Sequence, residues 1–133
     1  MNVVAIIQAR MSSKRLPGKV LMNLSKKPVL EHIIDRIKVC KTIDNIVVAT
    51  SNHASDDKIE KFCNQKHVPI YRGSLDDVLD RFYQAANIYN ADAILRITGD
   101  CPVIDPEIID TIVTSFKRDK VDYVDCQVTS LMA

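Results

Sequence analysis

A basic loop at residues 10–19 carries the side chains best suited to chemistry in this sequence. It holds four cations, two hydroxyl groups and one glycine. Fixed positive charge and backbone N–H groups offset the concentrated negative charge of a triphosphate. We therefore predict that this loop binds phosphate groups. The candidates are Arg10, Arg15 and Lys19 for the charge, with Ser12, Ser13 and the amide of Gly18 as further donors.

Two standard phosphate-binding motifs do not fit this loop. A Walker loop needs a glycine five residues before Gly18, where this chain has Ser13, and a serine or threonine after Lys19, where it has Val20. The dinucleotide fingerprint G-x-G-x-x-G is absent altogether. The loop is thus either a phosphate-binding segment of another kind or a solvated basic turn.

Apolar runs of strand length alternate with amphipathic helical patterns along the chain. The continuous runs at residues 3–7 and 46–50 are typical of strands buried on both faces of a parallel sheet. Other apolar runs lie at residues 68–71 and 93–97, and residues 122–124 could open a fifth strand. Helical patterns occupy residues 28–37, residues 75–89 and the segments that begin at Ser55 and Asp105. This alternation predicts an α/β domain with a mostly parallel sheet. Pro69 predicts that its strand begins there or lies at an edge.

The three glycines of the chain occupy similar places in this pattern. Gly18, Gly73 and Gly99 each fall just beyond the carboxyl end of a predicted strand. Ligands bind at that edge of open α/β sheets. The alternative is that each glycine simply serves a turn.

Length, charge and cysteine spacing restrict the class of protein. The chain has 133 residues, enough for one domain or part of one, and a formal net charge of +1. Binders of nucleic acid or membrane surfaces are normally strongly basic, so we expect neither partner. No apolar run approaches the roughly 20 residues of a membrane span, and the N-terminus lacks a signal-peptide pattern, which predicts a cytoplasmic protein. None of the four cysteines forms a C-x-x-C pair, which argues against a zinc ribbon or a redox motif.

The basic loop also carries a resemblance to a known family. Residues 6–21 read IIQARMSSKRLPGKVL, which resembles the opening of the cytidylyltransferases that activate sugar acids. Their relatives include the CMP-ketodeoxyoctonate and CMP-acylneuraminate synthetases, and the sequence is most similar to the spore coat polysaccharide biosynthesis protein F group. Residues 72–81 and 96–106 match two further blocks in the family's order and spacing. Together the three blocks cover most of the chain.

The resemblance implies roles for the residues of the first block. Arg10, Arg15 and Lys19 would contact the phosphates of CTP and act as the catalytic cations, assisted by Ser13. The backbone near Ala9 would approach the cytosine ring. A cation placed over a developing charge lowers the barrier electrostatically when water is excluded.

The third block implies a metal site. Asp100 resembles the family's metal-binding aspartate and would hold Mg²⁺, a hard cation that prefers oxygen ligands. By itself Asp100 would be read as a helix cap or a turn acid. Asp105 is better interpreted as the cap of the helix that begins at Pro106.

The second block implies contacts to the base and ribose. Arg72, Asp80 and Arg81 resemble nucleotide-binding residues of related synthetases, although relatives commonly have Gly-Thr before the Asp-Arg pair, where this chain has Val-Leu. The alternative for the acidic residues is a helix first turn that complements the helix dipole, and for Asp76 and Asp77 this is at least as good an interpretation.

The resemblance further implies a reaction and a domain. A hydroxyl of a sugar or sugar acid would attack the α-phosphorus of CTP in line, and pyrophosphate would leave. The implied fold is a three-layer αβα, Rossmann-like nucleotide-diphospho-sugar-transferase domain at residues 1–125, followed by a tail at 126–133. The family domain normally continues past this point with a second metal-binding aspartate, much of the sugar pocket and dimer contacts. We therefore expect a C-terminally truncated domain and a possible homodimer. Two alternatives stay open: a non-catalytic nucleotide-binding module, and a related transferase that uses another nucleotide.

Overall fold

The central feature of the computed structural model, which describes residues 1–12, 16–99 and 104–119, is a parallel sheet. Its strands lie in the order β5-β4-β1-β6. Their bounds are β1 Val3–Gln8, β4 Asn45–Ser51, β5 Ile70–Gly73 and β6 Ala93–Thr98. Each of these strands was expected from the sequence, and β5 begins just after Pro69 at an edge of the described sheet, as the proline predicts. The fifth strand expected at residues 122–124 lies outside the described residues.

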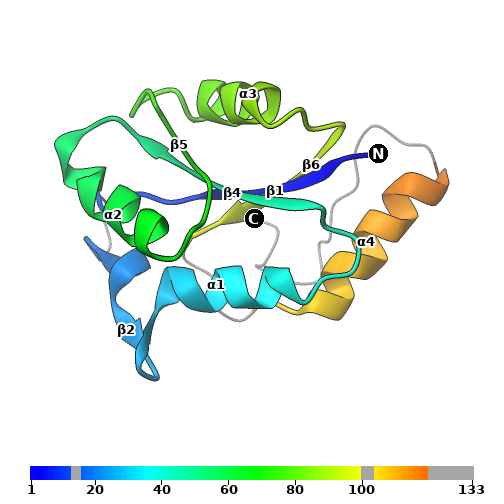
Figure 1. The fold of residues 1–133 in the computed structure, drawn as a ribbon, viewed down its shortest axis with the longest axis horizontal. Helices are drawn as coiled ribbons and strands as arrows, with labels where there is room; N and C mark the ends of the chain where they lie inside the picture. The colour runs from blue at the N-terminus through cyan, green and yellow to red at the C-terminus, as the bar shows by residue number, and fades with distance from the viewer. Residues whose placement is uncertain (13–15, 100–103, 120–133) are drawn as a thin grey trace.

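Helices cover both faces of this sheet (Figure 1). One face packs against α1, α2 and α4, and the opposite face packs against α3. Their bounds are α1 Val29–Lys38, α2 Asp57–Gln65, α3 Val78–Ile88 and α4 Pro106–Asp119. The three-layer α/β architecture expected from the sequence is therefore confirmed.

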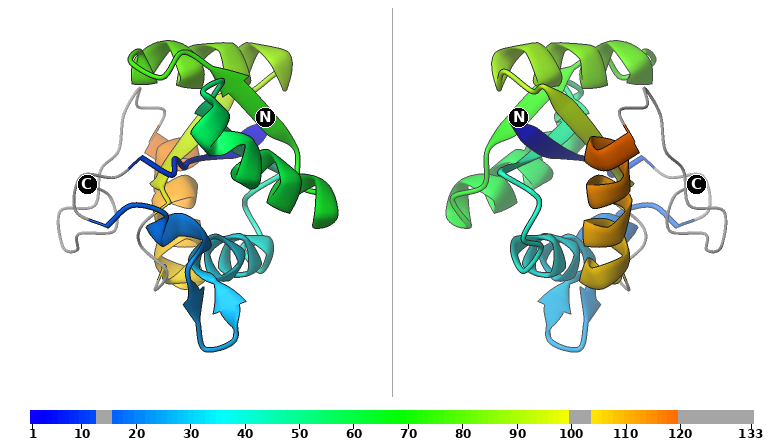
Figure 2. Two further views of the ribbon diagram at one scale, coloured as in Figure 1. Left: turned by 90° about the vertical axis from the view of Figure 1, so that its left-hand side faces the viewer. Right: turned by 90° about the vertical axis from the view of Figure 1, so that its right-hand side faces the viewer.

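Shorter elements connect the layers. They are the 3₁₀ turns η1 Lys19–Leu21 and η2 Ala54–Asp56, and a hairpin formed by β2 Asn23–Leu24 and β3 Lys27–Pro28. Figure 2 shows the hairpin projecting from the body of the molecule beside α1. In the described part of the chain, no helix is both long and apolar enough to cross a bilayer.

The first strand explains how the core is divided. Val3, Ala5 and Ile7 belong to the cluster with α1, α2 and α4, whereas Val4 and Ile6 belong to the cluster with α3. All five side chains are buried, because successive residues of a strand point to opposite faces and both faces are covered. Full burial of one such aliphatic side chain stabilises the fold by about 1.5–3 kcal/mol.

Two aspartates fix the starts of helices. A carboxylate oxygen of Asp77 accepts a hydrogen bond from the backbone N–H of Asp80 at 2.9 Å, so α3 begins at Val78 rather than at residue 75. The alternative interpretation of Asp77 as a helix-start acid is thus confirmed. Asp105 caps α4 in the same way, through a 2.9 Å hydrogen bond from the N–H of Glu107.

The other two helix starts differ from expectation by a residue or two. The segment at Ser55 opens as the 3₁₀ turn η2, because the ring of His53 accepts a hydrogen bond from the Ser55 N–H at 3.1 Å, and α2 follows from Asp57. Pro28 pairs with Asn23 in the hairpin, so α1 begins one residue later than predicted.

Asp110 fastens α4 to the loop before β4. Its carboxylate accepts hydrogen bonds from the N–H of Lys41 at 3.1 Å, from the N–H of Thr42 at 3.0 Å and from the Thr42 hydroxyl at 2.5 Å. Burial acts to raise the pKa of Asp110, but these hydrogen bonds outweigh it, and the pKa lies below its usual range. The folded protein therefore keeps Asp110 ionised to lower pH than the unfolded chain does.

We predict that Asp110→Ala lowers the free energy of unfolding by about 1–2 kcal/mol at pH 7. Because the folded pKa is depressed, this stabilisation is present above the ordinary aspartate pKa and is lost as the pH falls through the folded value. Urea unfolding at pH 7 and pH 3 should show a gap between wild type and variant that shrinks in acid. The matched control is Asp76→Ala, an exposed carboxylate in the loop before α3. An equally large difference in unfolding free energy between wild type and Asp110→Ala at both pH values would contradict a stabilising role for the ionised carboxylate.

Candidate active site

The end of β6 lies directly against the start of the basic loop. The N–H of Gly99 donates to the carbonyl of Gln8 at 2.7 Å, and the N–H of Ala9 donates to the carbonyl of Ala49 at 3.1 Å. A Cβ added to Gly99 would stand 2.8 Å from the Gln8 carbonyl oxygen and 3.2 Å from the Ala9 Cβ. This glycine is therefore required for a close approach of two backbones. The predicted metal ligand Asp100 is the next residue along the chain and lies outside the described residues.

The basic loop closes on itself. The N–H of Gly18 donates to the carbonyl of Met11 at 2.8 Å, and Gly18 has a left-handed backbone with φ of 76°. This hydrogen bond brings the two ends of the loop together. Arg10 precedes Met11 and Lys19 follows Gly18, so both residues lie where the loop closes. Arg10 is exposed and Lys19 is half-buried. The predicted ligands Ser13 and Arg15 lie outside the described residues.

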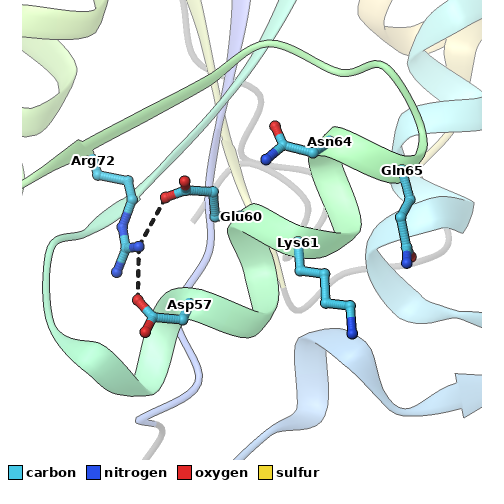
Figure 3. A pocket seen from close by; sticks show the side chains of 6 residues that line it. All are labelled: Asp57, Glu60, Lys61, Asn64, Gln65 and Arg72. Atoms are coloured by element: carbon cyan, nitrogen blue, oxygen red, sulfur yellow. Dashed lines mark hydrogen bonds and ion pairs between the residues drawn. The ribbon is translucent and has the colours of Figure 1, made fainter.

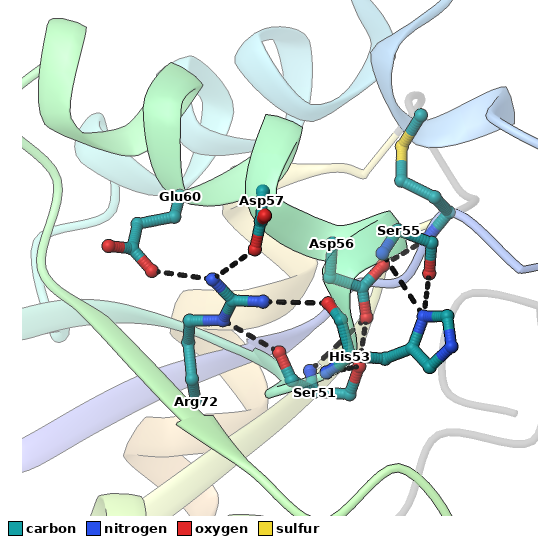
Figure 4. Close-up of polar contacts among 8 residues, drawn as sticks. Ser51, His53, Ser55, Asp56, Asp57, Glu60 and Arg72 are labelled. Carbon is teal, nitrogen blue, oxygen red and sulfur yellow. Dashed lines mark hydrogen bonds and ion pairs between the residues drawn. The ribbon is translucent and has the colours of Figure 1, made fainter.

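A buried carboxylate anchors the start of this loop. Asp56 is completely buried, and one of its oxygens accepts a hydrogen bond from the N–H of Met11 at 2.7 Å (Figure 4). The other oxygen accepts from the N–H of Ser51 at 3.3 Å and also contacts the Ser51 hydroxyl. From the sequence Asp56 read only as an early helix acid, and nothing in its neighbourhood distinguishes it from Asp57. Its role depends on a contact with a residue 45 positions away.

Arg81 places a positive charge inside the molecule, at the carboxyl edge of the sheet near Gly73. Its side chain is 1% exposed, and its Nε, Nη1 and Nη2 atoms have no hydrogen-bonding partner in the described part of the chain. Burial lowers the pKa of the guanidinium, the charge of Arg10 lowers it further, and Asp56 opposes them. The guanidinium of Arg81 thus lies within electrostatic range of both Arg10 and Asp56. A buried charge that lacks a partner costs several kcal/mol, which an anion bound between the two arginines would offset.

Arg72 has different surroundings from Arg81. Its Nη1 lies 2.8 Å from both the Asp57 and the Glu60 carboxylates on α2. Its Nε donates to the Ser51 carbonyl and its Nη2 to the His53 carbonyl, each at 2.8 Å (Figure 4). The hydrogen bond to Glu60 is the main cause that raises the pKa of Arg72, against the effect of burial. All three side-chain nitrogens are engaged, so these contacts favour a bracing role between β5 and the start of α2.

The hollow beside Arg72 does not join the site at the basic loop. It has a volume of about 620 Å³ and lies along α2, as Figure 3 shows. Its lining is Asp57, Glu60, Lys61, Asn64, Gln65 and Arg72. Arg72 points toward α2, whereas Arg81 belongs to α3 on the opposite face of the sheet. The structure thus separates two residues that the sequence placed in one block.

Asp80 precedes Arg81 in the first turn of α3. It is half-buried, and its carboxylate accepts a hydrogen bond from the Gln84 side chain at 3.4 Å. The described residues contain no group of three or more His, Cys, Asp or Glu side chains that could hold a metal ion. Within that part of the chain Asp56 belongs to no such group, and its carboxylate holds the backbone N–H groups of Met11 and Ser51.

Comparisons with known proteins identify the family of this chain. A family model described as cytidylyltransferase matches residues 4–132. The chain belongs to the cytidylyltransferase family. The family membership expected from the three sequence blocks is therefore confirmed.

Individual members of the family share about the same extent of sequence. The spore coat polysaccharide biosynthesis protein SpsF of Bacillus subtilis is 38% identical over 126 residues, which is 92% of this chain and 52% of SpsF. The structure of a cytidylyltransferase from Leptospira borgpetersenii aligns with a TM-score of 0.85 and 41% identity over 90% of this chain and 50% of that one. The structure of CMP:2-keto-3-deoxy-manno-octonic acid synthetase complexed with CTP aligns with a TM-score of 0.78 and 25% identity over 91% and 49% of the two chains. The chain spans about half the length of the curated relatives it matches.

We predict that Gly99→Ala disturbs the contact between β6 and the basic loop. The new methyl group would meet the backbone at Gln8 and Ala9, which have no flexible end to move aside, and the free energy of unfolding should fall by about 1–3 kcal/mol. Urea unfolding measures the change. Thr98→Ala, which removes atoms one residue earlier, is the control and should cost less than about 1 kcal/mol. Equal stability of Gly99→Ala and wild type would contradict the close approach.

Proposed function

We propose that this chain binds CTP at the carboxyl edge of its sheet and takes part in the transfer of CMP to a sugar or sugar acid, with release of pyrophosphate. The observation that carries the proposal is the buried guanidinium of Arg81, which lacks a partner among the described residues and lies beside Arg10. An arginine in such a place is suited to a planar or anionic group that arrives from outside. Family membership favours a cytidine nucleotide as that group.

Each cation has a separate task in this proposal. Arg10 and Lys19, where the loop closes, contact the phosphates from the solvent side. Arg15 and Ser13 provide the loop's other contacts with the phosphates. Arg81 provides charge from within, where the low dielectric strengthens its attraction for an anion. The backbone of Ala9, buried between β4 and Gly99, approaches the base. In-line transfer at phosphorus needs positioning and charge balance rather than a covalent nucleophile on the protein.

The metal assignment rests on a single residue. We assign Mg²⁺ to Asp100, because Gly99 is held against the start of the basic loop and Asp100 follows it directly. Mg²⁺ commonly takes one or two protein carboxylates, with phosphate oxygens and waters completing its shell. When bound there, it would act as a Lewis acid on the phosphate oxygens. Arg72 is assigned a structural role, bracing β5 against α2. Asp80, in the first turn of α3 next to Arg81, is assigned to the nucleotide site.

The spore coat relative favours a role in polysaccharide biosynthesis, with a sugar or sugar acid as acceptor. A second candidate is a nucleotide-binding module without transferase activity of its own. The observation that favours it is the buried guanidinium of Arg81 without a hydrogen-bonding partner among the described residues, which suits an anion whether or not transfer follows. Pyrophosphate release with CTP and a panel of sugar acids distinguishes the two candidates.

We predict that Arg81→Met weakens binding of CTP in the presence of Mg²⁺ by at least about 10-fold, because charge-assisted hydrogen bonds to the nucleotide are lost. The melting temperature should stay the same or rise, since an apolar side chain of similar length replaces a buried charge that lacks a partner. Calorimetry and thermal unfolding measure the two effects. Arg96→Met is the control: Arg96 is exposed, 5.0 Å over the Phe82 ring, and its loss should leave affinity unchanged. Unchanged affinity in Arg81→Met would overturn the proposed site.

We also predict selectivity for the cytosine base. Calorimetry with CTP, UTP, GTP and ATP, each with Mg²⁺, should give the tightest binding with CTP. The phosphates are common to all four nucleotides, so the difference reports contacts to the base. Equal affinity for the four would remove the cytidine assignment and leave a general triphosphate site.

A further inference from the structure

The described residues hold four buried polar or charged side chains, and all of them lie at one edge of the sheet. They are Thr50, Ser51, Asp56 and Arg81. Thr50 and Ser51 end β4, Asp56 follows in η2, and Arg81 lies in the first turn of α3. Buried polar groups normally exist in pairs that satisfy one another. Here Asp56 is satisfied by hydrogen bonds, whereas Arg81 has none in the described part of the chain.

Asp56 connects two segments that are far apart in the sequence. One oxygen holds the N–H of Met11 and the other holds the N–H and hydroxyl of Ser51. The N–H of Met11 belongs to the peptide group that follows Arg10. Fixing this peptide group therefore fixes the direction in which the Arg10 backbone leaves the sheet.

The same carboxylate provides the negative charge that faces Arg81. Its effect on the Arg81 pKa opposes those of burial and of Arg10. Asp56 opposes the effect of Arg10 on the Arg81 guanidinium through space, while the nitrogens of that guanidinium have no hydrogen-bonding partner in the described part of the chain. The guanidinium stays available to a ligand.

We propose that Asp56 is a positioning residue of the nucleotide site: it sets Arg10 through the Met11 amide and leaves the donors of Arg81 open for an anion. The inference rests on the proposed function, because it concerns the binding of the triphosphate. Asp56 itself does not touch the nucleotide. It acts through Arg10, so its loss should weaken the contacts that Arg10 makes with the triphosphate.

The direction of the effect separates positioning from a simple charge effect. Asp56→Asn removes a negative charge beside an anion site, so electrostatics alone would make CTP and inorganic triphosphate bind more tightly. Positioning predicts the opposite result. The asparagine amide nitrogen cannot accept a hydrogen bond, so one of the N–H groups of Met11 and Ser51 loses its acceptor. We expect the affinity for both ligands, measured by calorimetry with Mg²⁺, to fall about 10-fold.

The neighbouring residue provides a matched control. Asp57→Asn makes the same change of charge one position away, at a carboxylate that is 67% exposed and pairs with Arg72. It should leave triphosphate binding unchanged or slightly tighter. If both variants bind as tightly as wild type or more tightly, Asp56 is not a positioning residue.

A double-mutant cycle tests whether the effect passes through Arg10. In an Arg10→Met background, Asp56→Asn should cost little further affinity, whereas independent effects would add. Additive losses would overturn the proposal in favour of a general structural role. Failure of wild type to bind either ligand would overturn the proposed function instead, which is a distinct result.

A second variant covers the case in which Asp56→Asn does not fold. Ser51→Ala removes only the hydroxyl that contacts the carboxylate and leaves every charge in place. Positioning predicts a smaller loss in the same direction, about threefold. Unchanged affinity in a folded Ser51→Ala protein would contradict the proposal.

Discussion

The burial of a positive charge at the carboxyl edge of a parallel sheet is the constraint on which this structure depends. Arg81 is inside the molecule and has no hydrogen-bonding partner among the described residues, while Arg10 stands near it and adds repulsion. Such an arrangement costs stability unless something offsets it. The sheet provides the stabilisation through β1, which is buried on both faces, and among the described residues Asp56 provides an opposing charge. The remaining imbalance is positive, which is what a site for a nucleotide triphosphate requires.

Backbone contacts at this edge bring the ends of β1, β4 and β6 together. Parallel strands bring all of their carboxyl ends to one edge, and the loops that follow them must share that space. Gly99 allows the end of β6 to touch Ala9, and Asp56 ties the start of the basic loop to the end of β4. The start of the loop, from Ala9 to Met11, is therefore held by the ends of both β4 and β6. Preorganisation of this kind lowers the entropy that binding would otherwise cost.

Local patterns were sufficient to predict most of the fold but only part of the site. Continuous apolar runs predicted β1 and β4, because a strand covered on both faces shows no alternation, and shorter apolar runs predicted β5 and β6. The membership of the family was also predictable, since it depends on blocks of neighbouring residues, whereas the roles of Arg10 and Lys19 stay predictions. Asp56 was not, because its partners Met11 and Ser51 come from separate segments and its sequence context is that of any helix-start acid. The metal and phosphate ligands assigned to Asp100, Arg15 and Ser13 stay predictions.

The different fates of Arg72 and Arg81 show why a shared sequence block does not imply a shared site. Arg72 is on a strand, and strand side chains alternate between faces, so it projects toward α2 and meets the carboxylates of Asp57 and Glu60. Arg81 is on a helix of the opposite layer and projects back toward Gly73 at the sheet edge, where those carboxylates cannot reach. Arg72 is satisfied by the protein and braces it, whereas Arg81 has no hydrogen-bonding partner among the described residues. The two side chains are chemically identical, so their charge does not explain the difference. The face of the sheet on which each arginine lies does.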